Sequence, residues 1–307
     1  MSYTPILATK TLATIAAAMH HDQGALFRET LRDLIPQAED AYRGAEDPFR
    51  SHLGASLMGR PCSRELWYTF HWATEKKFEG QTLRLFNRGH LEEPRMMALL
   101  KMIGCTIWQF DSEGKQFRID GHKGHFGGGL DGVVLGVPDS PDEIMLTEFK
   151  THGEKSFIKL KDGGVREAKF EHFVQMQLYM GHHKLRVALY LAVNKNTDEL
   201  YGELVPYDER IREQFMTRAA LLIDAANPPA RINQSPGWYQ CKFCDHAPVC
   251  HGPAQPAKNC RTCRFSEPIA DAVWMCHNSG GCPGPLSKER QLAGCDQYSV
   301  NKAIKAK

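Results

Sequence analysis

The stretch that decides the fold is a pair of apolar runs, Leu130-Asp131-Gly132-Val133-Val134-Leu135 and Ile144-Met145-Leu146-Thr147-Glu148-Phe149, the second followed by Lys150. Residues 137–142 between them read Val-Pro-Asp-Ser-Pro-Asp and predict a turn, so the runs should pair as an antiparallel hairpin. With the turn centred near Asp139 and Ser140, we expect Leu135 to face Ile144, Val133 to face Leu146, and Asp131 to lie opposite Glu148. Cross-strand side chains in such pairs are about 5 Å apart, so the two carboxylates should converge.

Side-chain alternation along the second run places Glu148 and Lys150 on one face and Phe149 on the other, against an apolar layer. Converging carboxylates are hard oxygen ligands that suit Mg²⁺ or Mn²⁺, and the ammonium group of Lys150 can orient a water or offset negative charge. Asp142 fits less well as the first acid, because it belongs to the turn, about 20 Å from Glu148 along an extended strand. Glu-x-Lys alone is more often a solvated strand face, so the candidate site depends on Asp131.

Residues 170–183 predict a helix with several apolar side chains. Gln175 and Tyr179 are four residues apart on it, so they share a face that can point toward the hairpin. Taken alone, such a pair is ordinary packing plus a surface amide.

Together these residues resemble the PD-(D/E)xK nucleases of the RecB type, which include CRISPR-associated RecB-like exonucleases and phage recombination exonucleases. The resemblance covers most of residues 50–252. Its four elements occur in the family order, as Gly89-His90-Leu91-Glu92-Glu93, Asp131, Glu148-Phe149-Lys150 and Gln175-Met176-Gln177-Leu178-Tyr179. Spacing from Gly89 favours Glu93 as the early acid, with His90 and Glu92 as open alternatives. No proline precedes Asp131, a departure that leaves the carboxylate chemistry unchanged.

The resemblance implies a restriction-endonuclease-like α/β core, with a central mixed sheet flanked by helices. It implies a divalent cation held by Glu93, Asp131, Glu148 and the Phe149 carbonyl. Lys150 would assist the attacking water, and Gln175 and Tyr179 would position Lys150 and the DNA strand. The implied activity is a Mg²⁺- or Mn²⁺-dependent DNA exonuclease that hydrolyses phosphodiester bonds at DNA ends in recombination, repair or phage replication. DNA is the expected partner, and a single-strand annealing protein is a candidate second partner.

Two alternatives stay open beside this interpretation. One is a CRISPR-type DNA end-trimming nuclease that acts with a partner. The other is a catalytically inert DNA-binding module in which the cysteine clusters do the recognition, although the intact set of two acids and a lysine argues against it.

Cysteine usage is the second strong feature, since eight of the ten cysteines follow residue 240. Cys241, Cys244 and Cys250 lie in one short stretch, and Cys62 lies far upstream. This arrangement resembles the iron–sulfur RecB-type nucleases, including the AddB-like ones, and implies a [4Fe-4S] cluster on these four residues that closes a long loop. A Zn²⁺ tetrathiolate fits the same residues, and the preference for iron–sulfur rests on the family pattern.

A second site is predicted at Cys260, Cys263, Cys276 and Cys295, where zinc would staple a tail too small to have its own core. His277 and Cys282 are open substitutes for either later ligand. A DNA-contacting role for this tail is the alternative, suggested by Arg261, Arg264, Lys288 and Arg290. Cys105 is expected to be a buried apolar side chain.

The expected domains are an N-terminal helical cap with one cluster cysteine (1–80), the nuclease core (81–230), the iron–sulfur cysteine loop (231–252) and the zinc-binding tail (253–307). Helices are expected across 8–50, 53–72, 84–103, 170–183 and 208–226. Strands are expected near 105–110, 115–120, 126–136, 143–151, 185–194 and 200–207. Residues 151–160 read as a lysine-rich loop in which Phe157 either anchors the loop or stacks on a base, the anchor being preferred.

A chain of 307 residues with 42% hydrophobic content can bury one large core and a small appendage. Its net charge of +2 is uninformative, so DNA affinity must come from local clusters. The candidates are Arg60, Arg64, Arg84, Arg88, Lys155, Lys159, Lys161 and Lys169. The sequence has no stretch of membrane-spanning length and no convincing cleavage site near its start, which predicts a cytoplasmic protein, in the host cytoplasm if it is phage-encoded. In that reducing compartment thiols ligate metals and do not form disulfides.

Overall fold

The computed structural model describes residues 3–39, 49–75 and 77–305. The chain divides into two compact units. Unit 1 comprises Met1–Glu46, Phe78–Ile119 and Gly129–Arg212, and unit 2 comprises Asp47–Lys77, Asp120–Gly128 and Glu213–Lys307. This division differs from the predicted domains, because the first helices belong to the unit with the large sheet while Cys62 belongs to the unit with the other clustered cysteines.

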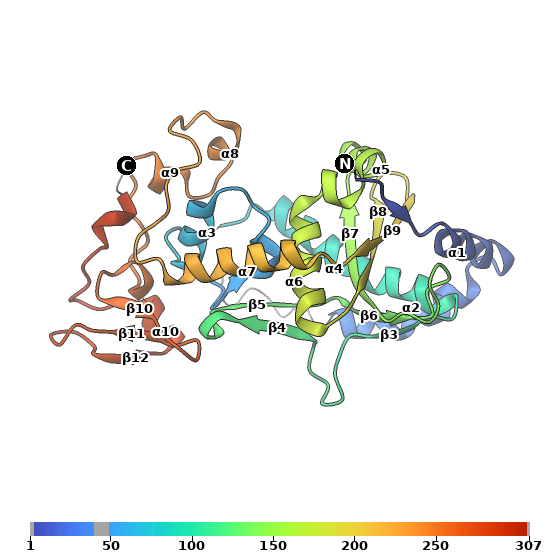
Figure 1. The fold of residues 1–307 in the computed structure, drawn as a ribbon, viewed down its shortest axis with the longest axis horizontal. Coiled ribbons are helices and arrows are strands. Elements are labelled where there is room, and N and C mark those ends of the chain that lie inside the picture. Colours follow the sequence, from blue (N-terminus) through green and yellow to red (C-terminus); the bar gives the residue numbers. More distant parts are fainter. Residues whose placement is uncertain (1–2, 40–48, 76, 306–307) are drawn as a thin grey trace. The chain divides into compact units, whose positions relative to one another are not determined.

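A six-stranded sheet forms the centre of unit 1, in the order β1-β9-β8-β7-β6-β3 (Figure 1). Strands β7 and β8 are parallel, and the other neighbouring pairs are antiparallel. The sheet is therefore mixed, as predicted. The strands are β1 (Ile6–Leu7), β3 (Thr106–Trp108), β6 (Gly132–Leu135), β7 (Met145–His152), β8 (Val187–Asn194) and β9 (Leu200–Pro206).

Helices cover both faces of this sheet. Helices α1 (Thr9–His21), α2 (Ala25–Glu39) and α4 (Gly80–Met102) lie on one face, and α5 (Glu154–Ala168) and α6 (Phe170–His183) lie on the other. Strand alternation explains the layers: Leu189 and Leu191 of β8 share a buried cluster with Leu100 of α4 and Ile15 of α1. Tyr190, between the two leucines, is fully buried on the α6 side. No helix in the described part of the chain is both long and apolar enough to cross a membrane.

The β6–β7 hairpin has the predicted register in its middle, where Val133 pairs with Leu146. This register is centred between Asp139 and Ser140, as predicted, and the N–H of Ser140 donates to the carbonyl of Val137 in the turn (2.8 Å). The predicted pairing of Leu135 with Ile144 is wrong, because the ladder ends at Val134 and Met145 and Ile144 is 47% exposed. In the turn, the Asp139 carboxylate accepts hydrogen bonds from the N–H (2.7 Å) and hydroxyl (2.6 Å) of Thr11 at the start of α1.

The lysine-rich segment predicted as a loop is helix α5 instead. Within this helix, Gly164 has a non-helical backbone conformation (φ 67°). Phe157 is 1% exposed, so its predicted anchoring role is confirmed and base stacking is ruled out. Lys155, Lys159 and Lys161 are exposed, although Lys161 pairs with Glu199 (2.6 Å), and Lys169 is half-buried and contacts Ser156.

Unit 2 contains helix α3 (Ser63–Phe70) and the C-terminal elements. A three-stranded sheet has the order β2 (Leu53–Gly54), β5 (Phe126–Gly129) and β4 (Arg118–Gly121). The following elements are α7 (Glu209–Asp224), α8 (Tyr239–Lys242), α9 (Ala247–Cys250), β10 (Ser266–Pro268), β11 (Trp274–Cys276), β12 (Gly284–Leu286) and α10 (Lys288–Ala293). Short 3-10 turns lie at Ala55–Leu57, His122–Gly124, Cys260–Thr262 and Lys302–Lys305.

Two arginines predicted to contact DNA are buried inside unit 2. Arg261 is 3% exposed, with its guanidinium 3.7 Å from the ring centroid of Trp72, and it donates hydrogen bonds to Gln291 Oε1 and the carbonyl of Phe70. Arg64 is also 3% exposed and donates to the hydroxyl of Tyr68 (3.0 Å). Both side chains stabilise the core of the unit, so the DNA-contacting interpretation is wrong for them.

Candidate active site

Asp131 reaches across from the end of β6 to β7. The β6–β7 ladder ends where Gly132 pairs with Thr147, and Phe149 follows two residues further along β7. The N–H of Phe149 donates to Asp131 Oδ2 (2.8 Å), so a carboxylate takes the place of the missing strand partner. The same oxygen lies 4.0 Å from Lys150 Nζ.

Glu148 is the most buried acid of the site, with a side chain that is 0% exposed. Its Oε1 forms an ion pair with Lys150 Nζ, and its Oε2 accepts a hydrogen bond from Gln175 Nε2 (3.1 Å). Lys150 Nζ also donates to the carbonyl of Phe149 (3.0 Å). The predicted alternation is confirmed, since Phe149 is 4% exposed and belongs to the apolar cluster on the α4 face.

Burial controls the ionisation of this cluster. It raises the pKa of Glu148 to about 7, against the opposing effect of Lys150 and with a further contribution from the charge of Asp131. The pKa of Asp131 is also raised, again mainly by burial. Burial by itself would lower the pKa of Lys150, but the carboxylates of Glu148 and Asp131 more than offset it and keep the ammonium charged.

The early acid lies on α4, next to the same residues. Glu93 and His90 line one pocket with Phe149 and Lys150, and His90 Nδ1 is 3.7 Å from Glu93 Oε1. The charge of Glu93 contributes to the raised pKa values of Asp131 and Glu148. Glu92 also lines the pocket but pairs with Arg95 (3.3 Å). The geometry therefore favours Glu93 over Glu92, and it gives His90 a position beside Glu93.

Gln175 and Tyr179 are buried on α6, at 7% and 2% exposure. Gln175 hydrogen-bonds to Glu148, whereas it was expected to position Lys150, so it fixes the acid beside the lysine. The predicted role of Tyr179 toward Lys150 and the DNA strand stays a prediction.

Sequence reasoning missed a histidine pair beside the acids. Tyr190 is the register partner of Glu148 on β8, and its hydroxyl lies 2.8 Å from His152 Nε2 and 2.9 Å from His172 Nδ1. Burial lowers the pKa of His152 to about 4 and that of His172 to about 2, so both imidazoles are neutral near pH 7. One signal was present in the sequence: His152 comes two residues after Lys150 on the same strand face.

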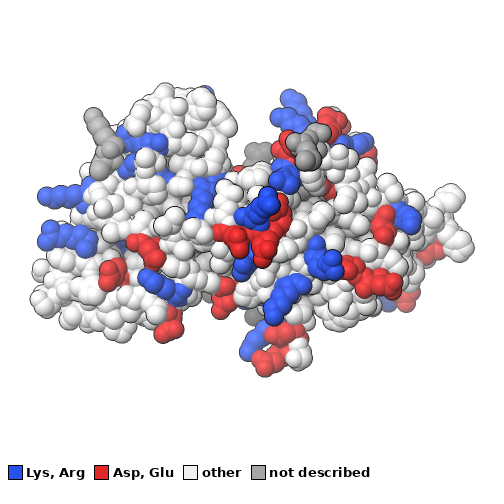
Figure 2. Space-filling view, in the orientation of Figure 1, with Lys and Arg blue, Asp and Glu red and all other residues white. Residues whose placement is uncertain are grey.

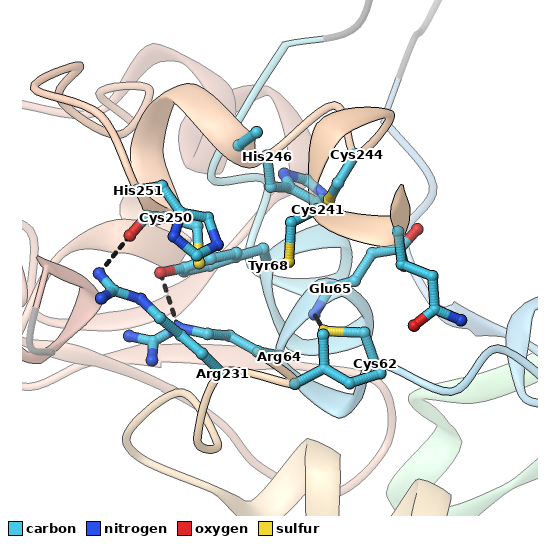
Figure 3. A pocket seen from close by; sticks show the side chains of 13 residues that line it. Cys62, Arg64, Glu65, Tyr68, Arg231, Cys241, Cys244, His246, Cys250 and His251 are labelled. Carbon is cyan, nitrogen blue, oxygen red and sulfur yellow. Dashed lines mark hydrogen bonds between the residues drawn. The ribbon is translucent and has the colours of Figure 1, made fainter. Parts of the chain in front are cut away.

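In unit 2, the four cysteines of the first predicted site line one pocket (Figure 3). Cys62 precedes α3, and its sulfur accepts a hydrogen bond from the N–H of Glu65 (3.4 Å). Figure 3 shows Cys62, Cys241, Cys244 and Cys250 arranged around one space. Burial raises the pKa of Cys241, and the charges of Cys62 and Cys250 raise it further. The structure thus brings together the four residues of the predicted set.

The second predicted set also converges. Cys260, Cys263, Cys276 and Cys295 line another pocket of unit 2 together with Cys282. Burial raises the pKa of Cys260 to about 11, with further contributions from Cys263, Cys295 and Cys276. Cys282 contacts the guanidinium of Arg290, and His277 is exposed with its Nε2 3.0 Å from Glu267. Of the two predicted substitutes, only Cys282 faces the pocket.

All ten cysteines are free thiols, and Cys105 is buried as predicted. Among the described residues, no three or more His, Cys, Asp or Glu side chains form a group that could hold a metal ion as they stand. At the acids, Lys150 lies against Glu148; at both thiol pockets, the side chains converge without forming a coordination shell.

Charged side chains of both signs share the face of the molecule drawn in Figure 2. Figure 2 shows Lys and Arg interspersed with Asp and Glu over the face that it presents, in keeping with the net charge of +2. In the predicted clusters, Arg60 pairs with Glu65 (2.6 Å), while Arg84 and Arg88 of α4 are exposed.

Comparison with known proteins gives only distant likenesses. No family model matches the chain, and no curated protein matches it. Two crystal structures of the alkaline exonuclease LHK-Exo from Laribacter hongkongensis, one of them in complex with dAMP, are 14% and 16% identical, with TM-scores of 0.40. Each likeness covers 56% of this chain and 86% of that one. The crystal structure of SSO0001 is 16% identical over 76% of this chain and 98% of its own, with a TM-score of 0.37. Identities and TM-scores this low assign the chain to no family.

Proposed function

We propose that this chain is a metal-dependent deoxyribonuclease that hydrolyses phosphodiester bonds at DNA ends. The observation that carries the proposal is the cluster of Asp131, Glu148 and Lys150, in which two acids and a cation lie together with little exposure. Burying such charges costs free energy that a hydrophobic replacement would not, so their presence is better explained by function than by stability.

Hydrogen bonds fix one oxygen of each acid. Gln175 holds Glu148 Oε2 and the N–H of Phe149 holds Asp131 Oδ2, so we assign Glu148 Oε1 and Asp131 Oδ1 to a divalent cation. Glu148 Oε1 fits this assignment because it is buried and accepts no well-aligned hydrogen bond from the described residues, although Lys150 is its ion-pair partner. Glu93 and the Phe149 carbonyl complete the proposed ligand set.

Mg²⁺ or Mn²⁺ would polarise a phosphoryl oxygen at this site and lower the pKa of a water. The protein residues have separate tasks. Glu148 must give up its proton before it can serve as a ligand, and Lys150, released from Glu148, can turn its ammonium toward the attacking water. Gln175 keeps the Glu148 carboxylate from rotating while Lys150 moves.

We also propose that the thiol pockets hold metals: a [4Fe-4S] cluster at Cys62, Cys241, Cys244 and Cys250, with Zn²⁺ as the alternative, and Zn²⁺ at the second set. Convergence of free thiols from separate segments supports this assignment. Their role would be to hold the segments of unit 2 together. Ten free thiols also suit a reducing cytoplasm. As part of the same proposal, the enzyme acts in recombination, repair or phage replication, with a single-strand annealing protein as its partner.

The test is a cleavage assay with the purified chain on labelled DNA in Mg²⁺ or Mn²⁺, with a chelator control. Glu148→Gln and Lys150→Ala should each lower cleavage by at least about a hundredfold, as expected for loss of a group that acts on the reacting atoms. Asp142→Asn, an exposed acid of the hairpin turn, is the matched control and should keep full activity. A wild-type protein that binds DNA but never cuts it would instead be an inert binding module.

A further inference from the structure

The N-terminal half of α4 carries large apolar side chains beside the acids. Leu85 and Phe86 are 49% and 45% exposed, and they line the same pocket as Glu93 and Lys150. Phe78, just before the helix, is 45% exposed, and its ring packs edge-on against that of Phe86 with the centroids 5.0 Å apart. Exposed apolar groups at the wall of a pocket mark a ligand-binding surface.

Helix geometry aligns this wall with the acids. Phe86, Gly89 and Glu93 follow one another at spacings of three and four residues, so they lie on one face of α4. At 1.5 Å per residue, Phe86 is roughly 10 Å from Glu93 along the helix axis. A DNA strand with a phosphate at the acids can therefore bring a neighbouring nucleobase to Phe86.

Gly89 lies between the two. A Cβ added there would meet no atom within 4 Å, so packing inside the chain does not explain the glycine, even though glycine is unfavourable within a helix. Because Gly89 lines the pocket, the missing side chain leaves room for a bound strand.

Cationic side chains also line this pocket. Lys150 and Lys195 line it, and the guanidinium of Arg88 donates to the carbonyl of Lys195 (2.9 Å), which attaches this segment to α4. The pocket thus offers an apolar wall and ammonium groups together. A nucleotide has the complementary pair, a flat apolar base face and an anionic phosphate.

We infer that Phe86, supported by Leu85 and Phe78, stacks on an unpaired nucleobase next to the scissile phosphate. Gly89 admits the sugar–phosphate backbone, and Lys195 pairs with the adjoining phosphate. The substrate class is thereby a DNA strand whose terminal bases are unpaired. This inference rests on the proposed nuclease function and adds to it a site for the base.

The test compares a single-stranded oligodeoxynucleotide with the same strand carrying abasic residues near its end. Loss of one base stack corresponds to roughly a 5- to 150-fold effect. We expect wild-type kcat/KM to fall by such a factor on the abasic strand. Phe86→Ala should lose a similar factor on the intact strand and nothing more on the abasic one. Leu83→Ala, equally exposed on α4 but outside the pocket, should match the wild type.

Gly89→Ala provides a second test, in which a loss of cleavage cannot be attributed to misfolding. Alanine favours the helix and meets no steric obstacle, so the melting temperature should not fall, while cleavage of the intact strand should. Fluorescence anisotropy with the same two strands, in chelator, measures stacking without catalysis.

The outcomes separate the two proposals. Cleavage by the wild type that is equal on both strands, and unchanged in Phe86→Ala, overturns the stacking site and leaves the nuclease intact. Absence of cleavage overturns the nuclease, and anisotropy then decides the stacking site: equal affinity of wild type and Phe86→Ala for the intact strand rejects it. Light scattering provides a further check. If the wild type is an oligomer and Phe86→Ala dissociates it, this face is a subunit interface and the stacking site is rejected.

Discussion

Gln175 on α6 donates a hydrogen bond to Oε2 of Glu148 on β7, across 3.1 Å and 27 residues of sequence. The bond joins a helix to the strand that carries the acids, at a place where the carboxylate is fully buried. A buried carboxylate oxygen without a donor is costly, so Gln175 both stabilises the fold and fixes the orientation of the acid.

We therefore predict that Gln175→Ala lowers the free energy of unfolding by about 1–3 kcal/mol, the usual cost of leaving a buried acceptor unsatisfied. It should also weaken Mn²⁺ binding, measured by calorimetry, because Glu148 loses the bond that fixes its orientation. Gln177→Ala is the matched control: Gln177 is buried on the same helix but bonds to the N–H of Asp208 (2.7 Å) and the carbonyl of Pro206 (3.2 Å). It should lose stability without losing metal affinity, and equal metal binding in both variants would contradict the role of Gln175.

The pH dependence of stability should report on Glu148. Its folded-state pKa of about 7 lies above the ordinary value of 4.5, so the folded protein holds this proton more tightly than the unfolded chain. The contribution to stability is complete below about pH 4.5 and is lost as the pH rises through about 7, for a total of about 3 kcal/mol. In metal-free protein, the difference in unfolding free energy between wild type and Glu148→Gln should therefore change across this window. A constant difference from pH 4 to pH 8 would place the Glu148 pKa near its ordinary value.

The same pKa predicts how metal and protons compete in the assay. A cation requires the deprotonated carboxylate, so at low Mn²⁺ concentration activity should rise with pH through about 7. A higher Mn²⁺ concentration should move the midpoint of this rise in activity to lower pH, because the ion displaces the proton from Glu148. Activity measured between pH 5 and 9 at several Mn²⁺ concentrations tests this expectation. If the midpoint of the rise in activity does not move with Mn²⁺ concentration, the rise reports the titration of another group.

The parts of the fold that depend on local pattern were predictable, and those that depend on distant contacts were not. Alternation in β6 and β7 gave the pairing of Val133 with Leu146, and helical periodicity gave α6 with both of its ends. The contact of the Asp139 carboxylate in the hairpin turn with Thr11, about 130 residues away, was not predicted, because no local signal reveals it.

The same contrast applies to the site. The proximity of Asp131, Glu148 and Lys150 was predictable from the hairpin, because strand geometry fixes which side chains share a face, whereas Glu93 followed only from the family resemblance. Tyr190 was missed because its place beside Glu148 follows from the parallel pairing of β7 with β8, which sequence spacing does not encode. Arg261 was misread as a surface cation, since its burial between Trp72 and Trp274 depends on segments far apart in the chain.

The ligands of the second thiol pocket can be separated by two matched variants. Cys276→Ser should lower the zinc content and the melting temperature, because the charge of Cys276 acts on Cys260 inside the pocket. Cys282→Ser should leave the zinc content unchanged, because the Cys282 sulfur contacts Arg290. Elemental analysis of protein purified in parallel decides between them, and loss of zinc in Cys282→Ser alone would exchange the two assignments.

The first thiol pocket has a matched control in Cys105. Cys62→Ser should abolish the visible absorbance and iron of anaerobically purified protein, because Cys62 lines the pocket with Cys241, Cys244 and Cys250. Cys105→Ser should keep both, since Cys105 is a buried thiol of unit 1 whose sulfur contacts the carbonyl of Gly136. If the wild-type protein is colourless and contains zinc, and Cys62→Ser contains no zinc, the first thiol pocket holds a Zn²⁺ tetrathiolate instead of a cluster.

Substitution of Arg261 distinguishes a structural role of the C-terminal tail from a nucleic-acid-binding role. Its guanidinium satisfies Gln291 Oε1 (2.7 Å) and the carbonyls of Phe70 (2.9 Å) and Ser51 (3.0 Å), so Arg261→Ala leaves buried acceptors without donors. We expect a loss of roughly 2–4 kcal/mol in the free energy of unfolding. Arg264→Ala, an exposed neighbour, should change stability by less than about 0.5 kcal/mol. If urea denaturation finds Arg261→Ala as stable as Arg264→Ala while its DNA affinity falls, the buried position of Arg261 does not represent its role, and the tail would have to open to bind DNA.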